Sequence, residues 1–281
     1  MKTAFCTCVQ LGLSCMQEIY AAGGKLDLVI TLRDELAPEK SGRIYVDDFC
    51  QTKDIPVIKI KSINEPEVIQ MLKDMAIDWL FIIGWSQIAQ KEVLEAPRLG
   101  ALGMHPTLLP TGRGRAAIPW AIIKGLDETG VTLFKLDEGV DTGPIIAQHH
   151  IVISNDETAT TLYDKVNEAH IKLIRAAWSD LLNGTVILVP QDDSRASIWP
   201  GRTPDDGLIL PTMTVEETDR LVRATTHPYP GAFWQANGKI LRIWSGSIGQ
   251  GTVSNKKTES LKLANGFYEA IDYQWEESEQ S

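Results

Sequence analysis

The sequence predicts an open, doubly wound α/β domain followed by a smaller β-rich domain. Two observations predict this organisation. Short apolar runs alternate with helical patterns over residues 1 to about 125, which is typical of βαβ units and a mostly parallel sheet. After residue 190 the chain becomes polar and rich in turn residues, and short strand-like segments follow. We therefore expect one domain over residues 1–190, a linker over 191–204 and a small domain over 205–281.

The elements of the first domain follow from local patterns. Residues 78–84 are almost continuously apolar, which is typical of a central strand buried on both faces. Asn64 is a candidate helix cap, and Pro66 fits the first turn of the same helix. The predicted strands in this part are 5–9, 26–31, 56–60, 78–84 and 101–104. The predicted helices are 12–20, 43–52, 64–75 and 91–95. This alternation predicts a Rossmann-like arrangement.

A loop and a second set of elements complete the chain. Residues 106–114 hold two Pro and two Gly, which indicates a loop. Thr214 and Glu217 have the spacing of a capping box at the start of a helix. The remaining predicted helices are 118–123 and 160–182, and the remaining predicted strands are 131–136, 145–153, 232–235, 239–244, 261–263 and 266–271.

Charge and apolar runs restrict the partners. The chain of 281 residues has 27 Lys and Arg against 37 Asp and Glu, a net charge of −10, which disfavours binding to polyanions. Residues 191–281 are themselves acidic. The densest apolar run, 79–85, is too short to span a membrane, and no His or Cys spacing indicates a metal site. We expect a cytoplasmic protein with no nucleic-acid partner, no membrane and no metal.

Two titratable residues are candidates for proton transfer. His105 ends a predicted strand, where a parallel sheet presents its ligands, and Asp141 lies between glycines in a predicted loop. A carboxylate there could orient a histidine, although a structural histidine and a turn aspartate explain each residue separately. Arg113 and Arg115 could bind phosphate. The loop after the first strand has one glycine, Gly12, which disfavours a dinucleotide site.

Several motifs together resemble the formyltransferase family that uses 10-formyltetrahydrofolate. The stretches that carry the resemblance are Gly103–Gly114, Pro119–Trp120, Thr129–Thr132, Asp141–Gly143 and Ile146–Gln148. In the second domain, Gly201–Gly207 and Arg223–Phe233 look like the carboxyl domain of an amino-sugar transformylase, and similar segments occur in methionyl-tRNA formyltransferases.

The resemblance implies a catalytic set of Asn, His and Asp. His105 and Asp141 match the last two residues, but Gly103 stands where the family has its Asn. That Asn donates to the formyl oxygen, and losing such a donor typically costs ~10²–10³ in rate. The His105 imidazolium, a backbone N–H, Ser86 and Gln87 are the candidates to replace it.

The resemblance also implies binding residues. N10-formyltetrahydrofolate would be the co-substrate, held by Gly84, Trp85, Ser86, Gln87, Ile88, Leu136, Asp137, Glu138, Gly139 and Asp141. The acceptor would be held by Gln10, Leu11, Gly12, Thr111, Gly112, Arg113, Gly114, Arg115, Thr226 and Tyr229.

Four acceptors or roles compete within this resemblance. We favour the amine of a nucleotide-linked amino sugar, such as a UDP- or dTDP-4-amino-4,6-dideoxyhexose, with a role in polysaccharide or glycan biosynthesis. Methionyl-tRNA is disfavoured because residues 191–281 carry nine Lys and Arg against thirteen Asp and Glu. The third reading is hydrolysis of the folate, with water as acceptor, and the fourth is a binding protein without catalysis. A homodimer is possible.

Overall fold

The computed structural model describes residues 1–39, 42–249 and 258–277, and it divides into two compact units. The first unit comprises Met1–Gly114, Gly130–Ile151 and Lys165–Ile198, and the second comprises Arg115–Thr129, Val152–Asp164 and Trp199–Ser281. Two central stretches of the chain thus group with the C-terminal residues. The domain boundaries at residues 190 and 205 stay predictions.

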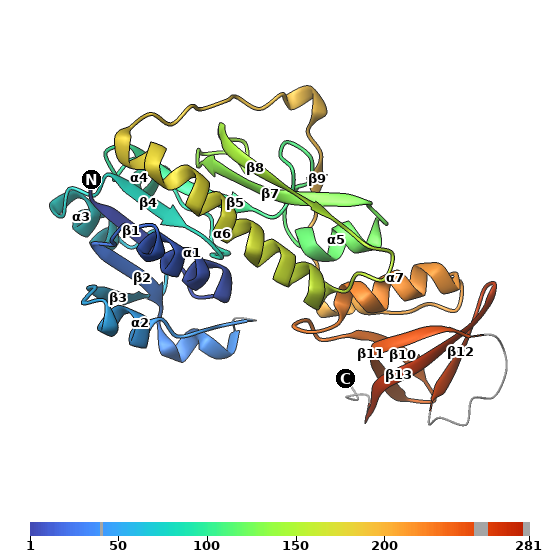
Figure 1. Cartoon of the computed structure of the whole chain (residues 1–281). Coiled ribbons are helices and arrows are strands. Elements are labelled where there is room, and N and C mark those ends of the chain that lie inside the picture. The colour runs from blue at the N-terminus through green and yellow to red at the C-terminus, as the bar shows by residue number, and fades with distance from the viewer. Residues whose placement is uncertain (40–41, 250–257, 278–281) are drawn as a thin grey trace. The chain divides into compact units, whose positions relative to one another are not determined.

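A seven-stranded sheet forms the centre of the first unit (Figure 1). Its order is β3-β2-β1-β4-β5-β7-β8. The first five strands of this order pair in parallel, and β7 pairs antiparallel with β5. The strands are β1 (Thr3–Cys6), β2 (Leu28–Leu32), β3 (Val57–Ile60), β4 (Trp79–Ile82), β5 (Gly100–His105), β7 (Glu128–Lys135) and β8 (Ile145–Val152). The predicted α/β fold class is confirmed.

Apolar side chains cover both faces of the central strands. On β1, Cys6 lies in a core cluster that also contains Leu72 of a flanking helix. Its neighbour Phe5 points to the opposite face and stacks on Phe81, with ring centroids 5.5 Å apart, and Phe81 in turn contacts Trp178 at 6.2 Å. Successive side chains on a strand alternate between faces, so helices are needed on both sides of the sheet.

Helices and short helical turns lie between these strands or follow them in the chain. They are α1 (Gln10–Ala21), η1 (Asp34–Glu39), α2 (Asp47–Thr52), α3 (Pro66–Asp74), α4 (Lys91–Leu94), α5 (Ala117–Ile123), α6 (Ala159–Asn183) and η2 (Asp193–Arg195). The helix predicted over 43–52 is shorter than expected. Asn64 does not cap α3, since Glu65 is the N-cap residue and lacks a side-chain cap bond. The Asn64 side chain instead bonds the backbone of Ile88 and Gln90.

The second unit contains an antiparallel sheet and a covering helix. The sheet order is β10-β11-β13-β12, and α7 (Val215–Thr225) contacts β11 and β13. The capping box predicted for Thr214 and Glu217 is present. The strands of this sheet are β10 (Ala232–Ala236), β11 (Lys239–Gly249), β12 (Glu259–Leu263) and β13 (Gly266–Glu277), and the unit also contains η3 (Pro204–Gly207). Of the two remaining short strands, β6 (Arg113–Gly114) belongs to the first unit, and β9 (Ile198–Trp199) stands at the boundary between the two units in the chain.

A helix that crosses a bilayer must be both long and apolar. Among the helices within residues 1–39, 42–249 and 258–277, none combines that length with that composition.

Candidate functional site

His105 ends β5 at the carboxyl edge of the parallel strands and is buried, with 7% of its surface exposed. Its Nε2 lies 2.7 Å from the carbonyl oxygen of Gly112. A carbonyl oxygen can only accept, so Nε2 carries the hydrogen and donates it. Nδ1 is therefore the ring nitrogen that can take up a further proton.

Asp141 faces that nitrogen. Its Oδ2 lies 3.6 Å from Nδ1 of His105 and accepts a hydrogen bond from the Gly114 N–H at 2.8 Å. The backbone of Asp141 is left-handed, with φ +55°, a conformation that Asp adopts more readily than most residues. The structure thus brings the two sequence-predicted catalytic residues together.

Close backbone approach explains the glycine that follows this turn. A Cβ added at Gly143 would lie 1.8 Å from the backbone oxygen of Lys135. Only glycine allows the chain to return beside the end of β7 there. The turn that carries Asp141 is therefore fixed by backbone contact, and the pair that it forms with His105 has the base and orienting carboxylate of a proton-transfer site.

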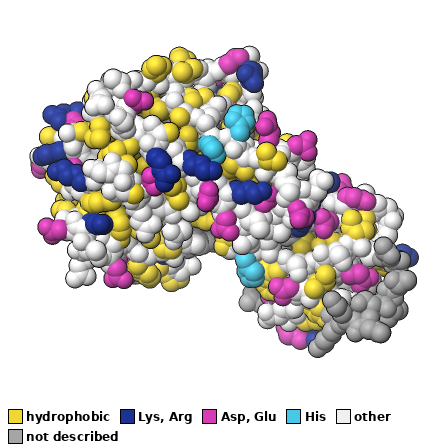
Figure 2. All heavy atoms as spheres, in the orientation of Figure 1, with side chains coloured by type: hydrophobic (Ala, Val, Ile, Leu, Met, Phe, Trp, Pro, Cys, Tyr) yellow, Lys and Arg dark blue, Asp and Glu magenta, His cyan; other side chains and the backbone are white. Residues whose placement is uncertain are grey.

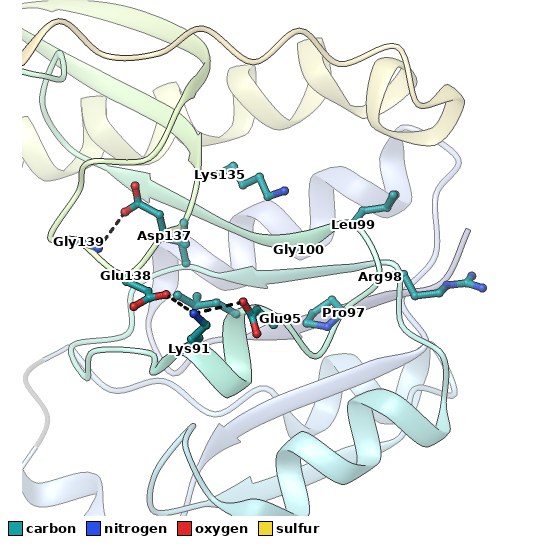
Figure 3. A pocket seen from close by; sticks show the side chains of 12 residues that line it. Lys91, Glu95, Pro97, Arg98, Leu99, Gly100, Lys135, Asp137, Glu138 and Gly139 are labelled. Atoms are coloured by element: carbon teal, nitrogen blue, oxygen red, sulfur yellow. Dashed lines mark hydrogen bonds and ion pairs between the residues drawn. The ribbon is translucent and has the colours of Figure 1, made fainter.

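Four residues predicted to bind the folate line a cavity in the first unit. Leu136, Asp137, Glu138 and Gly139 form one wall of a space of about 580 Å³ (Figure 3). Figure 3 shows Lys91 between Glu138 and Glu95, and the Lys91 Nζ lies 3.0 Å from the Glu138 carboxylate. The other lining residues are Leu94, Pro97, Arg98, Leu99, Gly100 and Lys135. The lining of the cavity thus combines apolar side chains with both cations and carboxylates.

The predicted folate loop at 84–88 is anchored to a neighbouring segment and does not line this cavity. Gln87 donates through Nε2 to the Lys61 carbonyl oxygen at 2.7 Å and accepts from the Ile63 N–H. Its amide is thus engaged, which removes it as a ready replacement for the family Asn. Of the other residues in this loop, Trp85 packs its ring against the hydrophobic core. Ser86 and Ile88 are exposed. Gly84 has a left-handed backbone, with φ +69°.

The space beside Gly103 is filled. A Cβ added there would lie 2.7 Å from Cδ2 of Leu136 and 3.4 Å from Cε1 of Phe134. Leu136 therefore occupies the direction in which an asparagine side chain would extend.

Replacing Gly103 with Asn is expected to lower stability by about 1–3 kcal/mol through overpacking and to bring no gain in rate. Removing the obstructing branch in Gly103→Asn/Leu136→Ala should recover part of the lost stability. Urea unfolding and formyl-transfer rates of the three proteins test this. A single Gly103→Asn variant that is both as stable as wild type and faster would contradict the account.

The residues predicted to bind the acceptor are distributed over both units. Leu11 and Gly12 are buried in the first turn of α1, which begins at Gln10, so the loop expected there is helical. Thr111–Gly114 lie in the first unit, whereas Arg115, Thr226 and Tyr229 belong to the second. The segment 112–115 does not open a helix, because β6 covers Arg113–Gly114 and α5 begins at Ala117.

Arg113 is not a free phosphate ligand. Its side chain is 8% exposed, and its Nη2 donates to the carboxylate of Asp193 at 2.7 Å. Nε and Nη2 also donate to Oε1 of Gln191, at 3.1 and 2.8 Å. The guanidinium thus has internal acceptors, and the expected role in binding the acceptor has no support at this position.

Gln191 and Ser197 are the residues at the site that sequence reasoning missed. Gln191 Nε2 donates to the carbonyl oxygens of Asp141 and Gly143, and Ser197 Oγ accepts from the Gly112 N–H. Both lie in the stretch predicted as a linker. Its polar composition gave no signal of a role beside the site.

A second buried histidine lies near the pair. Burial lowers the pKa of His170 to about 4, opposed by a hydrogen bond to the Val166 carbonyl oxygen, with a smaller lowering from His105. His170 is thus neutral in the folded protein at neutral pH.

Acid is expected to destabilise the protein through His170. The His170 ring takes up a proton near pH 6.5 in the unfolded chain but only near pH 4 in the folded protein. The contribution of His170 to the free energy of unfolding is therefore fully present above pH 6.5 and is lost as the pH falls towards 4. The loss amounts to about 3 kcal/mol. Urea unfolding from pH 7 to pH 4 should show it in wild type and less of it in His170→Leu. Identical pH dependence in both would contradict the assignment.

Comparisons with known proteins agree with this geometry. Residues 20–177 match the family model described as Formyl transferase, and residues 202–272 match Formyl transferase, C-terminal domain. The methionyl-tRNA formyltransferase of Agathobacter rectalis is 31% identical over 256 residues, which cover 90% of this chain and 82% of that protein.

Two solved structures share the fold at 18% identity. The N-formyltransferase from Helicobacter canadensis in complex with folinic acid and dTDP-3-aminofucose matches with a TM-score of 0.70, covering 98% of this chain and 100% of that one. The methionyl-tRNA formyltransferase from Clostridium thermocellum matches with a TM-score of 0.66, covering 99% of each chain.

These comparisons correct two expectations. The preference for an amino-sugar acceptor is wrong, because the relative at 31% identity is a methionyl-tRNA formyltransferase, whereas the sugar enzyme is similar only at the level of the fold. The expectation of no nucleic-acid partner is contradicted by the same relative. The net charge summed over the 91 residues 191–281 is a poor guide to tRNA binding, because it does not tell where the cations gather.

Proposed function

We propose that this chain, which belongs to the formyl transferase family, transfers the formyl group of 10-formyltetrahydrofolate to the amino group of methionyl-tRNA. One observation carries the proposal. The His105–Asp141 pair, 3.6 Å apart, lies in a chain that is 31% identical to a methionyl-tRNA formyltransferase over 90% of its length. Formyl transfer itself follows from the family, and the choice of acceptor rests on that relative.

His105 would move the proton that the reaction requires. Nδ1 takes the proton that the attacking amine loses and returns it to the folate nitrogen that leaves, so no proton is gained or lost overall. Asp141 stabilises the positive charge on the ring while the proton resides there. The Gly112 carbonyl oxygen fixes the ring orientation through the 2.7 Å bond to Nε2. The proximity of His105, Asp141 and the Gly112 carbonyl oxygen supports these roles.

The cavity lined by Leu136–Gly139 suits the donor. Leu94, Pro97 and Leu136 provide apolar surface for a flat ring system, and Lys135 is a cation that can pair with a carboxylate of a folate. Within the described residues, no side chain forms an ion pair with Lys135, so its ammonium group is available.

A group of cations in the second unit supports a polyanionic acceptor. The Lys124 Nζ lies 5.5 Å from the ring centre of Trp120 and 5.8 Å from that of Trp199, and the Arg202 Cζ lies 5.0 Å from Trp120. On the face shown in Figure 2, basic and acidic side chains are interspersed. A local cluster can contact phosphates even on a protein of net negative charge.

An acceptor comparison tests the proposal. Release of tetrahydrofolate from 10-formyltetrahydrofolate is followed spectroscopically with methionyl-tRNA, with uncharged tRNA and with no acceptor. We expect release to depend on methionyl-tRNA. Equal release in all three reactions would mean that water is the acceptor, and would overturn the proposal.

A further inference from the structure

The side chain of Gln191 connects the turn of Asp141 to a buried arginine. Its Nε2 donates to the Asp141 carbonyl oxygen at 2.8 Å and to the Gly143 carbonyl oxygen at 2.7 Å. Its Oε1 accepts two bonds from Arg113, at 3.1 and 2.8 Å. The amide thus uses both of its donors and both lone pairs of its oxygen.

We propose that Gln191 is a positioning residue that holds Asp141 in the orientation needed to act on His105. The inference rests on the proposed function, because it takes these two residues as the proton-transfer pair. Gln191 touches neither substrate nor the reacting atoms in this account. It acts through the backbone of the turn on which Asp141 stands.

The conformation of Asp141 needs such support. A non-glycine residue with φ +55° is in a sparsely populated region of backbone conformation, and such a conformation persists only where the surroundings over-determine it. Gln191 bonds the carbonyl oxygens on both sides of the turn, at residues 141 and 143. The Gly114 N–H then fixes the Asp141 carboxylate. Gln191 therefore holds the backbone of Asp141, and the Gly114 N–H holds its side chain.

Arg113 sets which way the amide faces. Its guanidinium has only donors, so the oxygen of Gln191 must point to it and the nitrogen must point to the two carbonyl oxygens. The ion pair with Asp193 at 2.7 Å keeps the guanidinium in place. A buried arginine with these acceptors thus fixes the side chain that holds Asp141.

The same segment also supports His105. Ser197 accepts from the Gly112 N–H through Oγ, at 2.9 Å, and from the Arg113 N–H through its carbonyl oxygen, at 2.9 Å. Gly112 in turn accepts the Nε2 hydrogen of His105. Residues 191–197, predicted as part of a linker, therefore brace both members of the pair.

The substitution Gln191→Glu tests the brace. Glutamate keeps the shape and the acceptor for Arg113 but has no N–H for the two carbonyl oxygens. We expect kcat to fall by ~10–100-fold, as for a small misplacement of a catalytic group, while KM for 10-formyltetrahydrofolate and for methionyl-tRNA stays within about twofold. The matched control is Gln70→Glu, the same change at an exposed residue that bonds Asp74 in α3. It should leave both parameters unchanged.

A spectroscopic measurement makes the test independent of turnover. The ring signals of His105 in a histidine NMR spectrum are identified by their loss in His105→Ala. We expect them to move in Gln191→Glu and to stay in place in Gln70→Glu. Circular dichroism and the melting temperature Tm give the folded fraction of each variant.

Two outcomes would overturn the inference. One is a Gln191→Glu enzyme with wild-type kcat and unmoved His105 signals. The other is a loss of kcat no larger than the loss of folded protein, since the role would then be merely structural. Failure of the proposed function would look different: wild type would not use methionyl-tRNA, yet the His105 signals would still report whether Gln191 holds the pair.

Discussion

Replacing His105 with alanine is expected to lower the rate of formyl transfer by ~10²–10⁴-fold, because the variant has no group to carry the proton from the attacking amine to the folate nitrogen that leaves. Asp141→Asn should also lose most of the activity. The asparagine oxygen can still accept from the Gly114 N–H, but it carries no charge to stabilise the protonated ring at Nδ1, 3.6 Å away. Steady-state kinetics with saturating donor and acceptor measure both effects.

His149→Ala is the control for these variants, because His149 lies in β8 and is half-buried. It should retain wild-type activity. Near-wild-type rates in His105→Ala or in Asp141→Asn would remove that residue from the proton-transfer assignment.

Replacing Gly143 with alanine is expected to cause the largest structural effect. The added Cβ would lie 1.8 Å from the Lys135 backbone oxygen, and backbone cannot yield as the end of a flexible side chain can. We expect a loss of stability of about 1–3 kcal/mol or more from this overpacking. The rate should fall by more than the loss of folded protein explains, because the turn that must move carries Asp141. Urea unfolding and kcat measure the two effects separately.

Gly201→Ala is the matched control for that variant. A Cβ at Gly201 would meet Cδ of Arg115 at 3.5 Å, an ordinary contact distance, so stability and rate should change little. A Gly143→Ala protein that unfolds and reacts like Gly201→Ala would contradict the close approach of the two backbone segments.

The α/β unit was largely predictable because its signals are local. The apolar run at 78–84 indicates a strand buried on both faces, and β4 is buried throughout. Errors arose where tertiary contacts set the local structure. The side chain of Asn64 anchors the loop after β4 instead of capping α3, and β6 forms at Arg113–Gly114, at the end of the segment expected to be a loop.

The candidate site was predictable only in part. His105 and Asp141 follow from the resemblance, and the structure places them 3.6 Å apart. The roles of Gln191 and Arg113 depend on contacts between residues 78 and 50 positions apart in the chain. No local pattern encodes such a contact. Arg113 consequently resembled a free phosphate ligand in the sequence, although its guanidinium is buried and bonded.

The acceptor was the point at which sequence reasoning failed. Nine basic against thirteen acidic residues in 191–281 disfavoured tRNA, but the position of charges decides phosphate binding more than their sum. Arg202 stacks on Trp120, which also contacts Lys124 from outside the counted segment. A count over the C-terminal residues could not register this cluster.

Transfer of a labelled formyl group is the decisive test that methionyl-tRNA is the acceptor. Wild type is incubated with 10-formyltetrahydrofolate labelled in the formyl carbon and with methionyl-tRNA, and label is then measured in the methionine released from precipitated tRNA. We predict label on that methionine with wild type and with Gln70→Glu, and its loss with His105→Ala. Label that stays on the folate, or that appears only as formate, would contradict the proposed function.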